Sequence, residues 1–408
     1  MALNKRKILN DPVYGFIALR YERLLDLIDH PFFQRLRRIS QLGLSSLVYP
    51  GATHNRYHHA IGAVHLMQNA IDEIRWKGHE ITDQEAEAVC MAILLHDIGH
   101  GPFSHALEHT IVQGVNHESI SVFIMNLLNE EMNGALNLTI EIFNDHYHKR
   151  FLHQLVSSQL DMDRLDYLSR DSFYSGVTEG KIGSERIIKM LNVVDDTLVI
   201  EEKGIYSIEK FIVARRLMYW QVYLHKTVLS AEFMLVNVLR RAKELVKSGK
   251  TVFASPALKL FLENDFQHQD FLADSSVLAA FCELDDYDIL GAIKVWQKHD
   301  DRVLSQLCTR LINRDLFKIA LRKEAYSQDE INKVIKRVAA QLGLNEHEAR
   351  YFVIHETVNN RAYDSSDSPI LVLMKSGELL DVAKASDHLN LSALAIKVEK
   401  HFLAFPSY

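Results

Sequence analysis

Apolar residues recur at helical spacing from about residue 20 to about residue 320, and this long helical periodicity constrains the fold more than any other feature. Thr82 and Glu85 form a capping-box pattern that predicts the start of one helix. The same periodicity predicts a helix over Tyr57–Ile74 and another over Leu155–Ser169. Five apolar residues would form the buried side of the helix that begins after Thr82: Ala86, Val89, Cys90, Ile93 and Leu94. We therefore predict a mainly α protein.

The character of the chain changes at about residue 324. A predicted helix, Gln328–Gln341, precedes strand-like runs at Tyr351–Ile354, Ile370–Met374 and Leu379–Val382. We expect two regions: a helical core over residues 1–320 and a small α+β C-terminal appendage over residues 321–408.

Composition narrows the classes of protein to consider. The net charge of -7 argues against a general polyanion-binding surface, so we do not expect nucleic acid as the main partner. The three cysteines, Cys90, Cys282 and Cys308, are far apart, which suggests a reducing compartment and no thiolate metal site. The N-terminus lacks the apolar segment of a signal peptide, and no apolar run is long enough to span a bilayer. We expect a cytoplasmic protein without a membrane segment.

Histidines are concentrated in one part of the sequence: ten of the 21 lie between His54 and His117. The segment Leu94–His105 places His96-Asp97 at the end of an apolar run, before a Gly-x-Gly-Pro turn. Buried imidazole and carboxylate groups are costly unless a metal or hydrogen bonds satisfy them. Four residues on three predicted helices have the side chains of a hydrolytic metal site: His59, His96, Asp97 and Asp163. For any one of these residues alone, a satisfied polar residue is the simpler interpretation.

Cationic and hydroxyl side chains accompany this set. Arginine suits phosphate oxygens, and a triphosphate needs several cations to neutralise it. His105 and Glu108 are three residues apart, so the carboxylate can orient the imidazole as a general acid or base. The alternative for the cationic residues is a solvated helical face. The residues in question are Arg164, Tyr167, Asp171, Arg215, Tyr223 and Lys226.

Over about its first 320 residues the chain resembles the HD-domain superfamily of metal-dependent phosphohydrolases. It is most similar to the deoxynucleoside triphosphate triphosphohydrolases, which include members that couple a sterile-alpha-motif domain to the HD domain. The motifs that carry the resemblance are Asn10-Asp11-Pro12, Gln34-Arg35-Leu36-Arg37, Pro50-Gly51-Ala52-x-His54-Asn55-Arg56-x-x-His59, the His96 segment, Asp161-x-Asp163-Arg164-x-Asp166-Tyr167 and Tyr223-x-His225-Lys226.

The resemblance implies a role for each matching residue. His59, His96, Asp97 and Asp163 would bind a divalent metal: Mn, Fe or Mg, or a transition metal together with Mg. His100 and His117 would contact the α-phosphate, with His105 supported by Glu108 beside the scissile bond. The triphosphate would be held by Arg56, Arg164, Tyr167, Arg215 and Tyr223. The sugar would be surrounded by Gln41, Leu42 and Asp171.

Members of this family are typically oligomers activated by nucleotides, so the resemblance implies a homo-oligomer, with a homotetramer favoured, and an activating (d)NTP. One regulatory site would be formed by Lys7, Asp29, Gln34 and Arg37. Its neighbour would be formed by Arg186, Lys203, His225, Lys226, Arg314 and Lys318.

We therefore expect metal-dependent hydrolysis of a dNTP substrate, with dGTP as the leading candidate, to deoxynucleoside and inorganic triphosphate. One alternative is another HD-type reaction, on a phosphodiester, a cyclic dinucleotide or a guanosine polyphosphate. A second alternative is a nucleotide- or nucleic-acid-binding protein in which catalysis is vestigial. The presence of all four ligand residues weighs against the second alternative.

Overall fold

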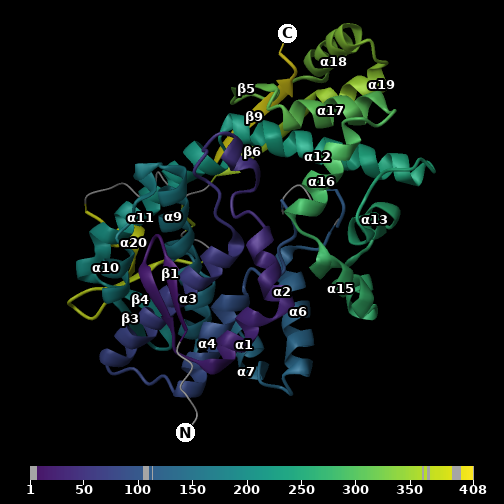
Figure 1. The fold of residues 1–408 in the computed structure, drawn as a ribbon. Coiled ribbons are helices and arrows are strands. Elements are labelled where there is room, and N and C mark those ends of the chain that lie inside the picture. The colour runs from purple at the N-terminus through teal and green to yellow at the C-terminus, as the bar shows by residue number, and fades with distance from the viewer. Residues whose placement is uncertain are drawn as a thin grey trace.

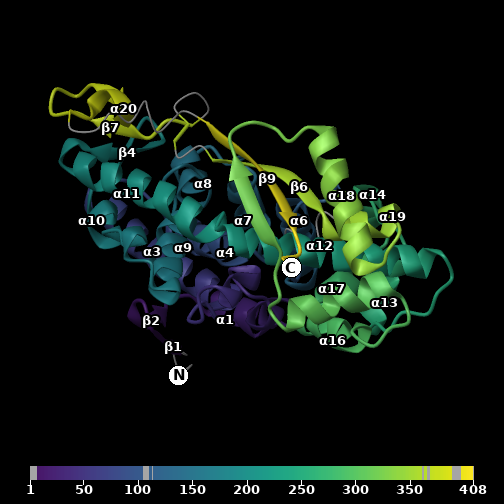
Figure 2. The ribbon, with the colours of Figure 1, turned by 90° about the horizontal axis from the view of Figure 1, so that it is seen from above.

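The computed structural model describes residues 7–103, 110–112, 114–360, 363–364, 368–387 and 397–407. It is mainly helical, with three small sheets, which confirms the predicted fold class. Figures 1 and 2 show an elongated molecule with two lobes. We call the part built around α1–α11 the N-terminal lobe and the part built around α12–α19 the C-terminal lobe.

The helices of the N-terminal lobe are α1 (Glu22–Asp29), α2 (Pro31–Gln34), α3 (Arg56–Trp76), α4 (Asp83–Leu95), α6 (His117–Glu131), α7 (Asn137–Phe143), α8 (Arg150–Val156), α9 (Met162–Ser175), α10 (Ser184–Lys189) and α11 (Ile205–Met218). The later helices are α12 (Lys226–Lys247), α13 (Pro256–Glu263), α14 (His268–Ala273), α15 (Ser275–Glu283), α16 (Asp286–Trp296), α17 (Arg302–Ile312), α18 (Gln328–Leu342), α19 (Glu346–Ala349) and α20 (Val382–Ala385). A 3-10 turn, η2 (Gly43–Leu47), follows α2, and a π-helical turn, η5 (Tyr219–Tyr223), joins α11 to α12.

One of the three sheets is a local hairpin, and the other two connect distant parts of the chain. Strands β1 (Lys7–Asp11) and β2 (Gly15–Leu19) form an antiparallel hairpin. The second sheet has the order β3 (Leu191–Val194), β4 (Thr197–Glu201), β7 (Leu371–Leu373), β8 (Leu379–Asp381), and its central β4–β7 pair is parallel. The third sheet is antiparallel, with β9 (Val398–Phe405) between β5 (Lys318–Arg322) and β6 (Ile354–Asn360).

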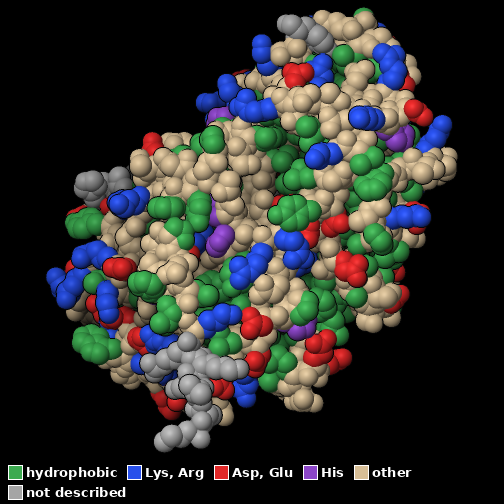
Figure 3. All heavy atoms as spheres, viewed as in Figure 1, with side chains coloured by type: hydrophobic (Ala, Val, Ile, Leu, Met, Phe, Trp, Pro, Cys, Tyr) green, Lys and Arg blue, Asp and Glu red, His purple; other side chains and the backbone are tan. Residues whose placement is uncertain are grey.

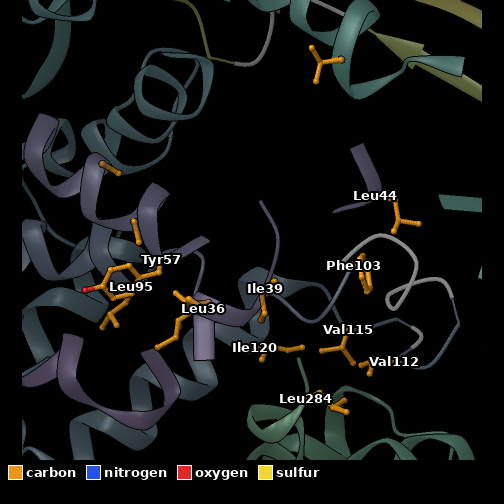
Figure 4. Packing of buried hydrophobic residues seen from close by; sticks show 14 of the residues in the cluster. Leu36, Ile39, Leu44, Tyr57, Leu95, Phe103, Val112, Val115, Ile120 and Leu284 are labelled. Carbon is orange, nitrogen blue, oxygen red and sulfur yellow. The ribbon is translucent and has the colours of Figure 1, made fainter. Parts of the chain in front are cut away.

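Helix α3 is the central helix of the N-terminal lobe. It packs against both α4 and α9, and residues on all its sides are buried, as the consecutive residues His59, Ala60, Ile61 and Gly62 show. The surrounding core draws on segments far apart in sequence: Leu36 and Ile39 precede α3, whereas Leu284 lies between α15 and α16 (Figure 4). The site described below is therefore held by helices that are themselves fixed in the core.

Two of the three helices predicted within residues 1–320 form as expected. The capping box of Thr82 and Glu85 begins α4, and α3 covers the predicted Tyr57–Ile74 segment. The helix predicted over Leu155–Ser169 is wrong at its start, because α8 ends at Val156 and a separate helix, α9, begins at Met162. Asp161 causes the break: its carboxylate caps α9 by accepting the backbone N–H groups of Arg164 at 2.7 Å and Ser158 at 2.8 Å.

The C-terminal region contains the predicted helix, α18, and short strands at the two later predicted positions. The first predicted strand is shifted: residues Arg350–Phe352 form a 3-10 turn, and β6 begins at Ile354. Tyr351 and Phe352 are buried in this turn, and their burial explains the apolar run that predicted a strand.

Among the described residues, no single helix has both the length and the apolar character needed to cross a membrane. One pair of helical segments, Glu202–Tyr223 and Lys226–Lys247, passes on length and composition alone, but it is bent by 55°. Many apolar residues of α12 in this pair are buried in the protein core. On the face drawn in Figure 3, positive and negative side chains are interspersed.

Candidate metal centre and adjoining cavity

Three helices bring the predicted metal ligands together. His59 lies in the second turn of α3, which is capped by Asn55. His96 is the C-cap residue of α4, and Asp97 follows it directly. Asp163 lies in the first turn of α9. Since α3 packs against α4 and α9, the four side chains meet at one point in the N-terminal lobe.

The donor atoms of these residues have the spacing of a metal site. His59 Nε2 lies 3.3 Å from His96 Nε2 and 3.0 Å from Asp163 Oδ1. His96 Nε2 lies 3.4 Å from Asp163 Oδ1 and 3.4 Å from Asp97 Oδ1. Ligand atoms held about 2.1 Å from one ion at right angles lie roughly 3 Å apart. Two imidazoles and two carboxylates are ligands that Mn, Fe and other borderline divalent ions accept.

The second nitrogen of each imidazole is already engaged. His59 Nδ1 lies 2.7 Å from Asp166 Oδ2, and His96 Nδ1 lies 2.7 Å from the carbonyl oxygen of Ile93. Both of these partners accept hydrogen bonds, so each Nδ1 carries the proton and each Nε2 is left to bind a metal. The residues present therefore fit a divalent cation.

Asp166 is itself held by a buried ion-pair chain. Arg170 donates to its two oxygens from Nε at 2.9 Å and Nη2 at 3.0 Å, and Arg170 Nη1 donates to Asp11 Oδ2 at 2.7 Å. Asp166 and Arg170 are fully buried. Because both charges are paired, this chain fixes His59 from the side opposite the metal.

The electrostatics of the cluster favour positive charge at its centre. Burial lowers the pKa of His59, but hydrogen bonds to Asp163 and Asp166 outweigh burial and raise that pKa to about 10. Burial raises the pKa of Asp163, yet hydrogen bonds from His59 and His96 hold it well below its usual value. A divalent cation supplies the same positive charge and displaces the imidazole protons at Nε2.

A second group of possible ligands adjoins the first. Asp97, His100 and His117 each place one donor atom within 4.8 Å of the others, and the two imidazole rings stack with centroids 3.8 Å apart. His100 Nε2 lies 3.2 Å from Asp97 Oδ1. Burial and the charge of Arg56 lower the pKa of His100 well below its usual value. Asp97 thus lies between the four-residue cluster and the two stacked histidines.

A cavity of about 480 Å³ opens beside this centre, between the two lobes. Arg56 links the two: it lines the cavity, and its Nη1 donates to Asp97 Oδ2 at 2.5 Å. The opposite wall belongs to the C-terminal lobe, with Phe233 on α12 and Val358 on β6. Six of the eight residues predicted to bind substrate line this cavity: Gln41, Leu42, Arg56, Tyr167, Asp171 and Tyr223.

Asp171 is held in place at the cavity wall by two hydrogen bonds. Its Oδ1 lies 2.7 Å from His54 Nε2, and its Oδ2 accepts from the hydroxyl of Tyr223 at 2.8 Å. The His54 ring stacks on Tyr174 at 4.4 Å between centroids. Each oxygen of Asp171 keeps a further lone pair for a ligand hydroxyl.

The other two predicted substrate residues lie close to Tyr167. Arg164 donates from Nη1 to the Tyr167 hydroxyl at 3.4 Å and from Nε to the carbonyl of Ser158 at 2.6 Å. Burial raises the pKa of Tyr167, and the nearby charges of Arg164 and Arg215 oppose that effect. The Nε of Arg215 is buried and has no hydrogen-bond partner within the described part of the chain.

The first set of predicted regulatory residues forms two contacting pairs, and one member of the set, Arg37, lies over Tyr57. Lys7 Nζ donates to Asp29 Oδ1 at 3.1 Å, and Arg37 Nε donates to Gln34 Oε1 at 2.8 Å. The Arg37 guanidinium lies 3.6 Å from the centroid of the Tyr57 ring.

The second regulatory set is more spread out. Arg186 Nη2 contacts the carbonyl of Lys203 at 3.4 Å, and Arg314 Nε donates to the carbonyl of Leu47 at 2.7 Å. His225 caps α12, Lys226 is its first residue, and Lys318 begins β5. His105 and Glu108 lie outside the described residues, so their predicted pairing stays a prediction.

Four residues of this region were given no role from the sequence: Asp11, His54, Asp166 and Arg170. The first three lie inside motifs that the sequence displays, so a signal existed. Their roles could not be assigned because each depends on a contact across the fold, such as His59 with Asp166, 107 positions apart.

Two family models match the chain over these elements. The HD domain matches residues 56–171, which contain the four ligand residues and Asp171, and the HD associated region matches residues 182–255.

Similar proteins cover most of the chain. The Bacillus subtilis protein YwfO, which is uncharacterised, is 32% identical over 403 residues, covering 94% of this chain and 88% of that protein. A Dictyostelium discoideum homolog of the deoxynucleoside triphosphate triphosphohydrolase SAMHD1 is 33% identical over 260 residues. That match covers 59% of this chain, which spans only half (50%) of the Dictyostelium protein.

Solved structures share the fold. The crystal structure of a phosphohydrolase from Bacteroides thetaiotaomicron has a TM-score of 0.96 and 56% sequence identity, covering 99% of this chain and all of that one (100%). A hypothetical protein from Aquifex aeolicus has the same fold, with a TM-score of 0.72 at 24% identity. With its HD domain, its ligand cluster and these relatives, the chain belongs to the HD-domain phosphohydrolase family and is similar to the deoxynucleoside triphosphate triphosphohydrolases in it.

Proposed function

We propose that this protein hydrolyses deoxynucleoside triphosphates to a deoxynucleoside and inorganic triphosphate. The observation that carries the proposal is the position of Arg56, which lines the cavity while it donates to Asp97 of the ligand cluster. A nucleotide bound in the cavity with its phosphates at Arg56 has its α-phosphorus beside the metal ligands. A divalent cation held there supplies Lewis-acid chemistry: it acidifies water and neutralises phosphate charge.

The side chains of the chain itself bind and orient the substrate. Arg56, Arg164 and Arg215 offset the charge of the triphosphate, since guanidinium groups pair with phosphate oxygens in a bidentate manner. Tyr167 offers a hydroxyl donor in the same region, and Tyr223, whose hydroxyl donates to Asp171, lines the cavity beside it. His100 and His117 would contact the α-phosphate; the contact of His100 with Asp97 and the stacking of the two imidazole rings support this role.

The sugar would bind at Asp171, Gln41 and Leu42. Asp171 is oriented by His54 and Tyr223 and can accept a hydrogen bond from the 3′-hydroxyl. Leu42 offers no polar partner to a 2′-hydroxyl, and a ribose hydroxyl buried there without a partner would weaken binding. This supports a preference for deoxynucleotides over ribonucleotides.

Regulation by a second nucleotide forms part of the proposal, with a homotetramer as the assembly. Of the residues Lys7, Asp29, Gln34 and Arg37, Arg37 lies over the ring of Tyr57, which is two residues before the ligand His59 on α3. A nucleotide bound to these residues would act on the helix that carries a metal ligand.

The experiment compares the purified protein with the Asp97→Ala and His96→Ala variants on each dNTP, with Mn²⁺ or Mg²⁺. The Asp300→Ala variant is the matched control, because His299-Asp300 is a second His-Asp pair and Asp300 is exposed. We expect triphosphate release by the parent protein and by Asp300→Ala, and loss of both bound metal and activity in Asp97→Ala and His96→Ala. Arg215→Ala should mainly weaken dNTP affinity.

Other outcomes would exclude the proposal. Turnover of a cyclic dinucleotide or a guanosine polyphosphate, with no turnover of any dNTP, would establish a different HD-type reaction. Full activity of a metal-free Asp97→Ala variant would remove the metal centre from the mechanism.

A further inference from the structure

The cavity wall contributed by α12 carries one carboxyl group among apolar side chains. Glu232 faces the cavity together with Leu229, Phe233 and Val236 of the same helix and Val358 of β6. It approaches η2, which lines the same cavity: a methyl group on Gly43 would lie 3.5 Å from Glu232 Oε1. Glu232 therefore lies on the part of the cavity wall that the C-terminal lobe contributes, and Arg56 and Tyr167 of the N-terminal lobe line the same cavity.

The described residues provide no partner for this carboxyl group. No hydrogen bond or ion pair joins Glu232 to any of them, and burial raises the pKa of Glu232 to about 7 without an opposing charge. Gln41, which lines the same cavity, has a buried Oε1 atom that also lacks a hydrogen-bond partner in this part of the chain. Glu232 is half-buried, and Gln41 Oε1 is fully buried. Acceptors without donors destabilise a protein when they leave water, so two unpaired acceptors on the lining of one cavity point to a ligand that supplies the donors.

The ligand must be flat, largely apolar and rich in N–H donors. Tyr219 and Phe233 give the cavity aromatic walls, and a volume of about 480 Å³ is in the range of small-molecule sites. A carboxylate accepts two parallel N–H groups. Among the four bases, only guanine presents two adjacent donors, N1–H and the N2 amino group, on one edge. Adenine and cytosine place one donor beside an acceptor, and thymine places one donor between two acceptors.

We infer that Glu232 selects the base of the nucleotide by accepting hydrogen bonds from the N1–H and N2 amino groups of guanine. This inference rests on the proposed function, since the phosphates at Arg56 and the sugar at Asp171 direct the base toward α12. It names guanine deoxynucleotides as the preferred substrate class. Glu232 is a specificity residue, and it has no part in the hydrolysis.

The test is the Glu232→Gln substitution, which preserves size and replaces one carboxylate oxygen by an amide donor. An amide donates to adenine N1 and accepts from adenine N6–H, but its NH₂ group opposes guanine N1–H. We expect the ratio of kcat/KM for dGTP to that for dATP to fall about tenfold or more, with turnover of dATP retained or raised. Glu244→Gln on the same helix is the control, because Glu244 is exposed and pairs with Arg241 at the surface.

Calorimetry of 2′-deoxyguanosine and 2′-deoxyadenosine binding separates this inference from the proposed function. Neither nucleoside carries a phosphate, so the measurement tests recognition of the base without hydrolysis. If the parent protein hydrolyses dNTPs but Glu232→Gln leaves the base preference unchanged, the role of Glu232 is overturned and the function stands. If no dNTP is hydrolysed, the proposed function fails, and calorimetry alone decides on Glu232. Selective deoxyguanosine binding that is lost in Glu232→Gln supports the inference, and equal binding of both nucleosides overturns it.

Discussion

Asp166 does not contact the centre of the ligand cluster, yet it orients His59 through Nδ1 and is itself held by Arg170. We expect Asp166→Asn to lower metal affinity by about 10- to 100-fold, because the amide is a weaker acceptor and cannot fix the imidazole as firmly. Metal titration followed by metal analysis of the dialysed protein measures this. Asp145→Asn, which changes a carboxylate outside the site, is the control. Equal metal affinity in Asp166→Asn and the control would show that His59 needs no support.

At the residue scale the sequence identifies side chains whose type and motif carry the chemistry, and the structure brings His59, His96, Asp97 and Asp163 together. The sequence alone cannot assign residues whose role comes from a contact with a residue far away along the chain. Asp11 contacts Arg170 across 159 positions, and Glu232 lies on α12 beyond the Tyr223-x-His225-Lys226 motif. Their roles depend on packing, and no local pattern encodes it.

Helix α3 can pack closely against α9 because Gly62 has no side chain. A methyl group there would lie 2.1 Å from both Arg170 Nη2 and Asp166 Oδ1. We expect Gly62→Ala to destabilise the protein by about 1–3 kcal/mol, since neither buried partner can move away freely. Gly291→Ala in α16 is the matched control: nothing lies within 4 Å, so it should stabilise by roughly 0.5–1 kcal/mol. Chemical denaturation checks both, and equal effects would contradict the packing argument.

The first turn of α4 depends on ionised Glu85. Burial raises the pKa of Glu85, but hydrogen bonds from Lys149, Tyr147 and Thr82 outweigh burial and lower it from its ordinary 4.5 to about 2. A lowered folded-state pKa means that this stabilisation is complete above pH 4.5 and is lost as the pH falls toward 2. Glu85→Gln should cost about 1–2 kcal/mol at neutral pH and less at about pH 3. Denaturation at both pH values tests this, and a pH-independent difference would contradict it.

At the element scale, helix starts are predictable where a capping residue precedes an apolar stripe, as at Thr82. The break before α9 could not be predicted from periodicity, because Asp161 stops one helix and caps the next within an otherwise continuous pattern. The strand predicted at Tyr351 fails for a related reason: apolar residues also fill buried turns.

The C-terminal region is tied to the helical core at several points. Strand β7 pairs with β4 through Ile200 and Val372, and β9 pairs with β5. Lys400 lies 3.9 Å from the centroid of the Trp220 ring, and Asn237 donates to the carbonyl of Tyr351 at 2.8 Å. β6 also contributes Val358 to the cavity. The predicted boundary between a helical core and a C-terminal appendage near residue 320 stays a prediction. The contacts named above join residues on its two sides.

We expect β9 to unfold together with β5, because each supplies hydrogen bonds to the other. Hydrogen exchange followed by mass spectrometry, over a range of denaturant concentrations, measures this. Peptides from the two strands should lose protection at the same denaturant concentration. Earlier loss in β9 alone would show that the C-terminal region is an independent unit.

The central claim, that the metal centre and the cavity act together to release triphosphate from a deoxynucleotide, is tested most directly by one reaction in oxygen-18 water. The parent protein is incubated with dGTP and Mn²⁺, and the products are followed by phosphorus NMR and mass spectrometry. Our account predicts inorganic triphosphate carrying the label on one terminal phosphorus, together with unlabelled deoxyguanosine. Pyrophosphate, orthophosphate or label in the nucleoside would contradict it.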